Sequence, residues 1–286
     1  MNAQLDVIVR FHNVARLPEL ERCLLSLIGQ AYRPLSIFIV TQRFDAAATK
    51  TVQTVLDTLQ LIEPDVTIAI LNYADPEPAD ARSSLINMGF AEATGRYAAL
   101  LDYDDIMTTN GYTRLVNDLA ATGTAISFGR IIGARLMVDG PLLMTRTRQP
   151  LYDEGNVISL LRQNFCPIHS FVIDRTRIDP TSLYFDPSLS RNEDYDFLIR
   201  TCADYPASFG QGHYTVGYYC LKDDGSNTVV AAGQVTAAQW EDWKCSDRRI
   251  ERLRNTKRVS LRVQRYLGRT PDPELTVAQL IGESGP

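Results

Sequence analysis

Short apolar runs alternate with helix-like patterns along the first part of the chain. Apolar residues that are consecutive or nearly so predict buried β-strands over residues 5–11, 35–40, 66–71 and 97–101. Between these runs, a spacing of three and four between apolar residues predicts helices over residues 17–28, 46–61 and 84–94. Strands that alternate with helices are typical of βαβ units around a parallel sheet. The pattern therefore predicts an α/β fold.

The second part of the chain continues with elements of both kinds. The same patterns predict helices over residues 112–121 and 193–203, and strands over residues 126–132, 170–173 and 213–221. Residues 231–267 are helical in pattern, and a tail with Pro and Gly follows. A polar segment with two prolines, residues 74–84, predicts a surface loop after the third strand. Loops at the carboxyl ends of parallel strands are where open α/β sheets bind ligands.

Composition and charge exclude several classes of protein. With 286 residues, 45% hydrophobic and 22% charged, the chain is typical of one large globular unit or two packed halves. No apolar run approaches the ~18 residues of a membrane span and the first residues lack a signal-peptide layout, so we expect a cytoplasmic protein. A net charge of −5 argues against a nucleic-acid partner. Five dispersed cysteines without a CxxC pair indicate reduced thiols.

Residues 248–269 contrast with the acidic remainder of the chain. They hold nine Lys or Arg and a single acid, Glu251, with apolar residues between the arginines. Basic amphipathic helices adhere to anionic membrane surfaces, which would place the protein peripherally at the inner face of the membrane. A charged helix packed on the acidic body, or one that joins a partner subunit in an oligomer, fits the same pattern. The sequence leaves these three alternatives open.

Three carboxylates follow directly on the fourth predicted strand, in the segment Asp102-Tyr103-Asp104-Asp105. Like charges this close disfavour ionisation, so a cation is expected among them. Mg²⁺ is commonly held by one or two carboxylates together with substrate phosphates. In an extended segment Asp102 and Asp104 would point the same way, with Tyr103 opposite. The alternative is that this DYDD segment only caps the next helix and turns the chain.

The sequence around these acids resembles family 2 glycosyltransferases, which have the GT-A fold. Residues 87–105, NMGFAEATGRYAALLDYDD, follow the family pattern RNxGxxxAxGxYxxxLDxDD without a gap. The matching positions are Asn87, Gly89, Ala93, Gly95, Tyr97, Leu101, Asp102, Asp104 and Asp105. IVRFHN at 8–13 is similar to the family's first strand and loop, usually IPTYN, and residues 185–200 are similar to its late segment with an ED pair. The resemblance covers residues 5–228.

The resemblance implies a fold, a division of the chain and an activity. The fold is a GT-A-like, Rossmann-type α/β fold, with a mostly parallel central sheet flanked by helices and a helical C-terminal extension. Residues 1–120 would bind a nucleotide-sugar, residues 121–230 would bind the acceptor and supply the base, and residues 231–286 would form the basic extension. The activity is transfer of a hexosyl or deoxyhexosyl group from a nucleotide diphosphate donor to an acceptor hydroxyl, with inversion. The acceptor would be a glycan or lipid-linked glycan, in cell-envelope polysaccharide synthesis.

The resemblance also assigns roles to residues. Asp104 would bind Mg²⁺ or Mn²⁺, Asp102 would share the ion or bind the ribose, and Asp105 would orient the loop. Asp194 would be the catalytic base, supported by Glu193. The remaining donor-binding positions would be Phe11, Asn13, Gln42, Arg82 and Tyr103.

Several features keep other interpretations open. Asn192 and Glu193 are also suited to cap a helix, and Arg82 is equally suited to neutralise Asp80. The family usually has VDDGSxD after its second strand, but this chain lacks the nucleotide-reading acid and offers Gln42 instead. The donor could therefore carry UDP, dTDP or GDP. The alternatives to a glycosyltransferase are a nucleotidyltransferase and a non-catalytic scaffold that binds nucleotides or glycans.

Overall fold

Four parallel strands form one half of the central sheet. In the computed structural model, which describes residues 2–139, 142–152, 155–223 and 236–284, these strands are β1 (Leu5–Phe11), β2 (Leu35–Gln42), β3 (Val66–Tyr73) and β4 (Tyr97–Asp102). They lie in the order β3-β2-β1-β4, and Arg10 of β1 stands beside Asp102 of β4 in the register. The parallel pairing confirms the βαβ arrangement that the apolar runs predicted.

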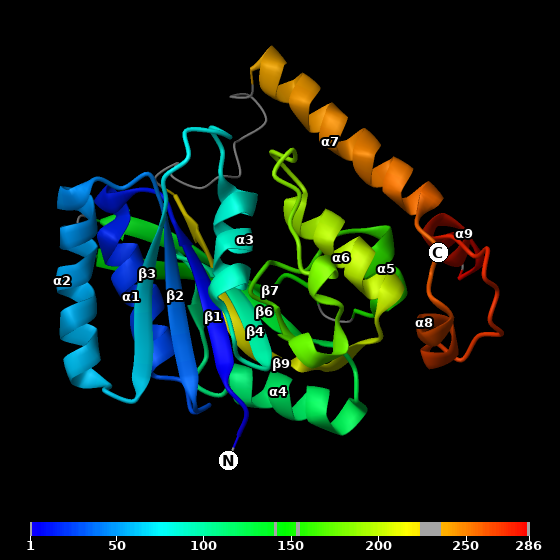
Figure 1. The fold of residues 1–286 in the computed structure, drawn as a ribbon, viewed down its shortest axis with the longest axis horizontal. Helices are drawn as coiled ribbons and strands as arrows, with labels where there is room; N and C mark the ends of the chain where they lie inside the picture. Colours follow the sequence, from blue (N-terminus) through cyan, green and yellow to red (C-terminus); the bar gives the residue numbers. More distant parts are fainter. Residues whose placement is uncertain (1, 140–141, 153–154, 224–235, 285–286) are drawn as a thin grey trace.

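The second half of the sheet is mixed. β8 (Phe171–Asp174) runs antiparallel to both β4 and β6 (Ile126–Asp139), whereas β9 (Ala207–Lys222) runs parallel to β6. Two strands that the sequence did not predict, β5 (Ile106–Met107) and β7 (Leu142–Pro150), pair with β9 and β6. All strands of the described residues belong to one sheet, which confirms the expected α/β fold (Figure 1).

Helices cover both faces of this sheet (Figure 1). One face packs against α1 (Leu17–Ile28), α2 (Ala46–Ile62) and α4 (Gly111–Thr122). The other packs against α3 (Arg82–Glu92), α5 (Val157–Arg162) and α6 (Glu193–Asp204). Successive side chains of a strand point to opposite faces, so Val7 and Val9 of β1 join the first layer and Ile8 joins the second. A strand buried on both faces needs the continuous apolar run seen in the sequence.

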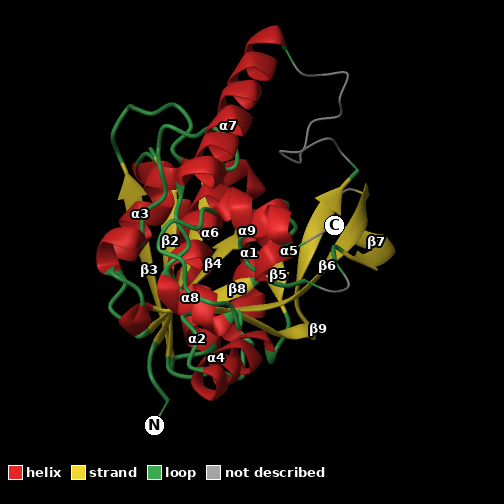
Figure 2. Ribbon diagram, turned by 90° about the vertical axis from the view of Figure 1, so that its right-hand side faces the viewer, coloured by secondary structure: helices red, strands yellow, loops and turns green. Residues whose placement is uncertain are grey.

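The C-terminal extension consists of α7 (Ala237–Thr256), α8 (Leu261–Tyr266) and α9 (Val277–Glu283). The prediction of one helix over residues 231–267 is wrong beyond Thr256, and its residues 231–235 lie outside the described residues. After α7 the chain extends, and the Val259 amide donates to the Leu275 carbonyl at 2.8 Å. Figure 2 shows α7 projecting from the body, and Figure 1 shows its C-terminal end beside α9.

The basic residues of this extension contact the body of the protein. Arg249 pairs with Asp186, and Lys257 Nζ lies 2.6 Å from Asp204 Oδ2. The interpretation of residues 248–269 as a charged segment packed on the acidic body is thus confirmed for these two cations. Among the described residues, none of the helices is both long enough and apolar enough to cross a bilayer.

Smaller elements and the thiols complete the fold. Short 3-10 turns lie at Val14–Arg16, Arg175–Arg177 and Pro180–Ser182. All five cysteines are free, and four of them are buried while Cys245 is exposed. The expectation of reduced thiols is therefore confirmed.

Candidate active site

Asp102, the first of the three acids, ends β4 and is paired with Arg10 of the neighbouring strand. Arg10 Nε and Nη2 lie 2.7 and 2.8 Å from the two carboxylate oxygens of Asp102. The third guanidinium nitrogen, Nη1, donates to Glu193 Oε1 at 3.1 Å. Burial acts to raise the pKa of Asp102, but the Arg10 charge outweighs it and holds that pKa below its ordinary value. Arg10 therefore joins an ionised Asp102 to the ED pair.

The expectation of an extended DYDD segment is wrong. The chain turns directly after β4, where the Asp105 amide donates to the Asp102 carbonyl at 3.1 Å. Asp104 consequently faces a different cation from Asp102: its Oδ2 lies 3.3 Å from Nζ of Lys222, the last residue of β9. Arg22 fixes the turn by donating to the Asp104 carbonyl at 2.7 Å. Because of this turn, Asp102 pairs with Arg10 and Asp104 pairs with Lys222.

Asp105 holds this turn against β9. The Cys220 amide donates to Asp105 Oδ1 at 2.8 Å, and His169 Nδ1 lies 3.3 Å from Asp105 Oδ2. Burial raises the pKa of Asp105 well above its ordinary value, and burial lowers the pKa of His169 to about 4. The buried position suits the orienting role expected for Asp105.

Asp194 lies at the start of α6. Its Oδ1 accepts the Tyr195 amide at 2.7 Å, and its Oδ2 accepts a bond from Asn164 at 3.4 Å. Burial and the adjacent charge of Glu193 raise the pKa of Asp194 to about 7. A carboxyl group with this pKa can take up and release a proton near neutral pH, which is what a general base requires.

Asn192 stands at the N-cap position of α6, where its carbonyl accepts the Asp196 amide at 2.8 Å. Its backbone is left-handed, with φ of 62°, and its side chain makes no capping bond. Instead, Asn192 Nδ2 donates to Asp247 of α7 at 3.0 Å. The alternative interpretation therefore holds for the position of Asn192 but not for its side chain.

Three of the predicted donor-binding residues lie around the end of β1. The Phe11 ring is fully buried and meets the Tyr103 ring edge-on, with centroids 5.2 Å apart. Tyr103 is buried as well, and burial raises its pKa to about 12. Asn13 is exposed, and its side chain accepts the Ala15 amide at 3.0 Å. Phe11 and Tyr103 therefore pack against each other in the core, while Asn13 orders the loop after β1.

Gln42 is the last residue of β2, and Arg82 is the first residue of α3. Gln42 Nε2 donates to the Ala79 carbonyl at 2.9 Å, which joins the end of β2 to the loop between β3 and α3. Arg82 pairs with Asp80 at 2.7 Å, as the alternative interpretation proposed, but its Nη1 also lies 3.9 Å from Glu193 Oε1. The structure therefore brings Arg82 to the ED pair and leaves Gln42 at the edge of the site.

Three residues of the site were missed at the sequence level: Arg10, Lys222 and Asn164. Arg10 stands where the resembled family usually has a proline, and that departure was a signal. Lys222 and Asn164 have no motif around them. The acids that they contact come from distant parts of the chain, so only the folded arrangement brings them together.

The two acids assigned to a metal differ in how well they fit that role. Among the described residues, no group of three or more His, Cys, Asp or Glu side chains is arranged to hold a metal ion. Both oxygens of Asp102 already accept bonds from Arg10, which makes it the poorer ligand. The Asp104 side chain is 24% exposed, so it fits as a single carboxylate ligand of the kind Mg²⁺ uses beside substrate phosphates.

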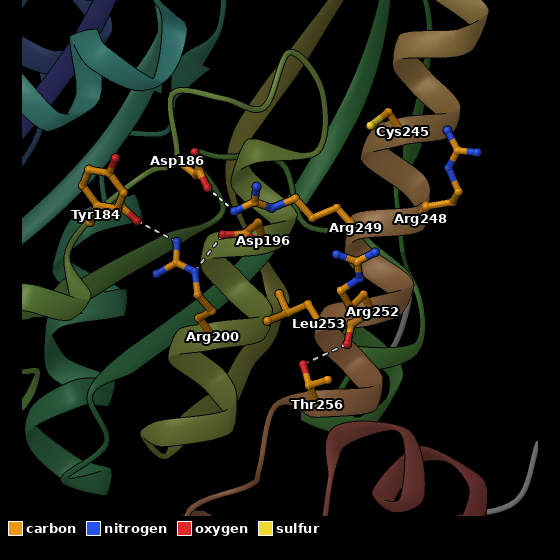
Figure 3. Close-up of a pocket in the computed structure, with 10 residues that line it drawn as sticks. All are labelled: Tyr184, Asp186, Asp196, Arg200, Cys245, Arg248, Arg249, Arg252, Leu253 and Thr256. Atoms are coloured by element: carbon orange, nitrogen blue, oxygen red, sulfur yellow. Dashed lines mark hydrogen bonds and ion pairs between the residues drawn. The ribbon is translucent and has the colours of Figure 1, made fainter.

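Two cavities flank α6 and α7. One of about 340 Å³ includes Asn164 in its lining, and Asn164 is the residue that bonds Asp194. The other, of about 620 Å³, is shown in Figure 3, where Arg249 reaches Asp186 and Arg200 reaches Asp196. None of the predicted site residues lines either cavity. The smaller cavity is connected to Asp194 through Asn164.

Comparisons with known proteins bear on this arrangement. The sequence model described as Glycosyl transferase family 2 matches residues 6–179. No curated protein sequence matches the chain significantly.

Solved structures with a similar fold include two complexes of S. aureus TarS 1-349. The complex with UDP has a TM-score of 0.56 at 13% identity, over 76% of this chain and 60% of that chain. The complex with UDP-GlcNAc has a TM-score of 0.57 at 12% identity, over 85% of this chain and 65% of that chain.

The mannosyltransferase PcManGT from Pyrobaculum calidifontis, in complex with GDP-Man and Mn²⁺, is also similar. It gives a TM-score of 0.54 at 14% identity, over 79% of this chain and 59% of that chain. The chain thus spans less than two thirds of each of these proteins. At such identities the likeness is one of fold.

Proposed function

The chain belongs to glycosyl transferase family 2, and from that premise we propose that it transfers a sugar from a nucleoside diphosphate sugar to an acceptor hydroxyl. One observation carries this proposal: Arg10 binds Asp102 of the DYDD segment and Glu193 of the ED pair with the same guanidinium group. The segment expected to bind the donor and the segment expected to supply the base therefore meet at one site.

The proposed reaction is a single displacement at the anomeric carbon of the donor sugar. Asp194 takes the proton from the acceptor hydroxyl as its oxygen bonds to the anomeric carbon, and the bond from that carbon to the diphosphate breaks. Base and leaving group lie on opposite faces of the sugar, so the anomeric configuration inverts. The pKa of about 7 allows Asp194 to be ionised for this step at neutral pH.

The donor is proposed to lie across the carboxyl ends of β1, β2 and β4, as ligands do in open α/β sheets. Asp104 would hold a divalent Mg²⁺ or Mn²⁺ ion there, and Arg82 would face the diphosphate. When bound, such an ion neutralises charge on the departing diphosphate. The fold likeness to proteins in complex with UDP, UDP-GlcNAc and GDP-Man with Mn²⁺ supports a nucleotide-sugar donor and leaves the nucleotide open.

The acceptor is proposed to enter the cavity of about 340 Å³ whose lining residue Asn164 bonds Asp194. Its polar lining residues include Asn164 after α5, Asn192 before α6 and Asp247 of α7. Amide and carboxylate groups suit a hydroxyl-rich ligand such as a glycan, because each can bond several hydroxyls. A role in cell-envelope polysaccharide synthesis stays a prediction from the family resemblance.

A binding and turnover experiment tests the proposal. The wild-type protein is mixed with UDP-, dTDP- and GDP-sugars, with and without Mn²⁺, and its thermal stabilisation and slow donor hydrolysis are measured. We expect one nucleotide class to raise the melting temperature. Asp194→Asn should keep that stabilisation and lose hydrolysis by a factor on the order of 10²–10⁴, because only the base is removed.

The other variants separate metal binding from general damage. Asp104→Asn should lose the Mn²⁺-dependent part of the stabilisation. Asp57→Asn, at an exposed carboxylate of α2, is the matched control and should behave as wild type. A wild-type protein that no nucleotide-sugar stabilises, with or without Mn²⁺, would contradict the proposed function and leave a scaffold for other ligands as the remaining candidate.

A further inference from the structure

Lys222 places a buried cation directly on the carboxylate assigned to the metal. It is the last residue of β9, and its side chain is 1% exposed. Its Nζ lies 3.3 Å from Asp104 Oδ2 and 3.6 Å from Glu19 Oε1. A buried ammonium stays charged only when anionic partners offset the loss of water. The charge on Asp104 is thus already balanced from within the protein.

Asp102 is the poorer alternative ligand for a metal. Arg10 occupies both of its oxygens, so each acid assigned to the metal faces a cation of the chain. A divalent ion that took Asp104 would sit next to the Lys222 ammonium, and like charges at such distances repel. A diphosphate group changes this balance, because its negatively charged oxygens can bind the metal ion and the Lys222 ammonium at the same time.

Resting on the proposed function, we propose that Lys222 is an internal counter-ion of Asp104, with which a divalent metal ion must compete. The metal then binds weakly to the protein alone and strongly once a nucleoside diphosphate has entered, when Lys222 turns from Asp104 to the phosphates. By linkage, the metal strengthens nucleotide binding by the same factor. Lys222 is in this sense a positioning residue, because it sets the order in which the metal ion and the donor bind.

The test measures Mn²⁺ binding itself, by the electron paramagnetic resonance signal of free Mn²⁺. Titrations are run without nucleotide and with UDP, dTDP or GDP, on wild type and on Lys222→Met. We expect the wild type to bind Mn²⁺ at least about tenfold more tightly with the matching diphosphate than without it. Lys222→Met should bind Mn²⁺ at least about tenfold more tightly than wild type when no nucleotide is present, because the competing charge is gone.

A second lysine, Lys257, provides a control for the loss of one positive charge. Lys257 also forms an ion pair, with Asp204 at 2.6 Å, but lies in the C-terminal extension. Lys257→Met should titrate as wild type does. The folding of each variant is checked by its cooperative thermal transition, and Lys222→Gln, which also removes the charge, replaces Lys222→Met if the latter unfolds.

The outcomes separate this inference from the proposed function. Equal Mn²⁺ binding by wild type and both Lys222 variants without nucleotide would overturn the role of Lys222, even if nucleotide binding is normal. A wild type that binds none of UDP, dTDP and GDP at any Mn²⁺ concentration would overturn the proposed function instead. In that case a Lys222 variant with tighter Mn²⁺ binding would still establish the competition at Asp104.

Discussion

A single guanidinium group sets the charge balance between the two halves of the candidate site. Arg10 bonds both oxygens of Asp102 and one oxygen of Glu193, and all three side chains are mostly buried. A planar fork with several N–H groups can bond both oxygens of one carboxylate and still donate to a second, a geometry that the point charge of a lysine does not match. The contact leaves the Glu193 charge next to Asp194, where it helps to raise the pKa of the proposed base.

That raised pKa predicts how the reaction depends on pH. With the pKa of Asp194 at about 7, the carboxylate form is lost below neutrality, so we expect kcat to fall about tenfold per pH unit below pH 7 and to level off above it. The profile is measured from pH 5.5 to 9, with stabilisation by the donor nucleotide recorded at each pH. Unchanged donor binding together with a flat kcat across this range would rule out Asp194 as the base.

The raised pKa of Asp194 also predicts that the free energy of unfolding depends on pH. The pKa of Asp194 is raised from an ordinary 3.8 to about 7, so the folded state prefers the protonated form. The penalty for ionising Asp194 in the folded state is absent below about pH 4, grows between about pH 4 and 7, and is complete above. Asp194→Asn removes this penalty, so its melting temperature should exceed that of wild type at pH 8 and approach it towards pH 4. A gain that is equal at both pH values would contradict the shift.

The acids of the site could be predicted from the sequence, but their partners could not. Asp102 and Asp104 stand with a specific spacing at and just after the end of a buried strand, and Asp194 lies within a recognisable segment. Arg10 and Lys222 reach these acids because β1 pairs with β4 and β9 ends beside the turn, and no local pattern encodes either contact. Charge partners of this kind depend on tertiary structure.

At the scale of elements, patterns inside the core were reliable and patterns at its edges were not. The strands β1 and β4 are buried along almost their whole length, so packing and sequence pattern agree. β7 is an edge strand whose described side chains are mostly exposed, and it carries no apolar alternation to predict it. The predicted long helix fails at residues 257–260, because there the backbone bonds the segment before α9 instead of continuing the helix.

The packing of α3 on β1 explains one glycine of the resembled pattern. A Cβ atom on Gly89 would lie 2.4 Å from Cγ2 and 2.9 Å from Cγ1 of Ile8, atoms fixed close to the backbone of β1. Ile8 is 1% exposed and cannot move aside. Gly89 therefore lets α3 approach the strand that carries Arg10.

We expect Gly89→Ala to lower the free energy of unfolding by about 1–3 kcal/mol, because it overpacks this contact. Gly282→Ala in α9 is the control, since nothing lies within 4 Å of its added Cβ, and it should be neutral or slightly stabilising. Urea unfolding measures both. If the contact with Ile8 is the cause, Gly89→Ala should lower the free energy of unfolding much less when Ile8 is also replaced by Ala. A loss as large in the Ile8→Ala protein as in wild type would contradict this explanation.

At the scale of the whole molecule, the C-terminal extension belongs to the core of the α/β body. Val259, Val263, Val277 and Leu280 are buried in the same cluster as Phe90 of α3 and Phe197 of α6. The sequence predicted a basic helix and a tail, because the apolar positions of this region are sparse and split by the break after α7. Removing the extension to test membrane contact would therefore also remove part of the core.

This packing predicts a strong effect from a single truncation in α9. Leu280 is fully buried, so Leu280→Ala should lower the free energy of unfolding by about 2–5 kcal/mol through lost burial and a cavity. Leu261 of α8 is 37% exposed, so Leu261→Ala removes less buried apolar area and should lower the free energy of unfolding by less than about 1 kcal/mol.

The unfolding of both variants in urea is followed by tryptophan fluorescence and by far-ultraviolet circular dichroism. An extension that is integral to the core requires one coincident transition by the two probes. Equal small losses for both variants, or an early separate transition, would show instead that residues 257–283 unfold independently of the sheet that carries the site.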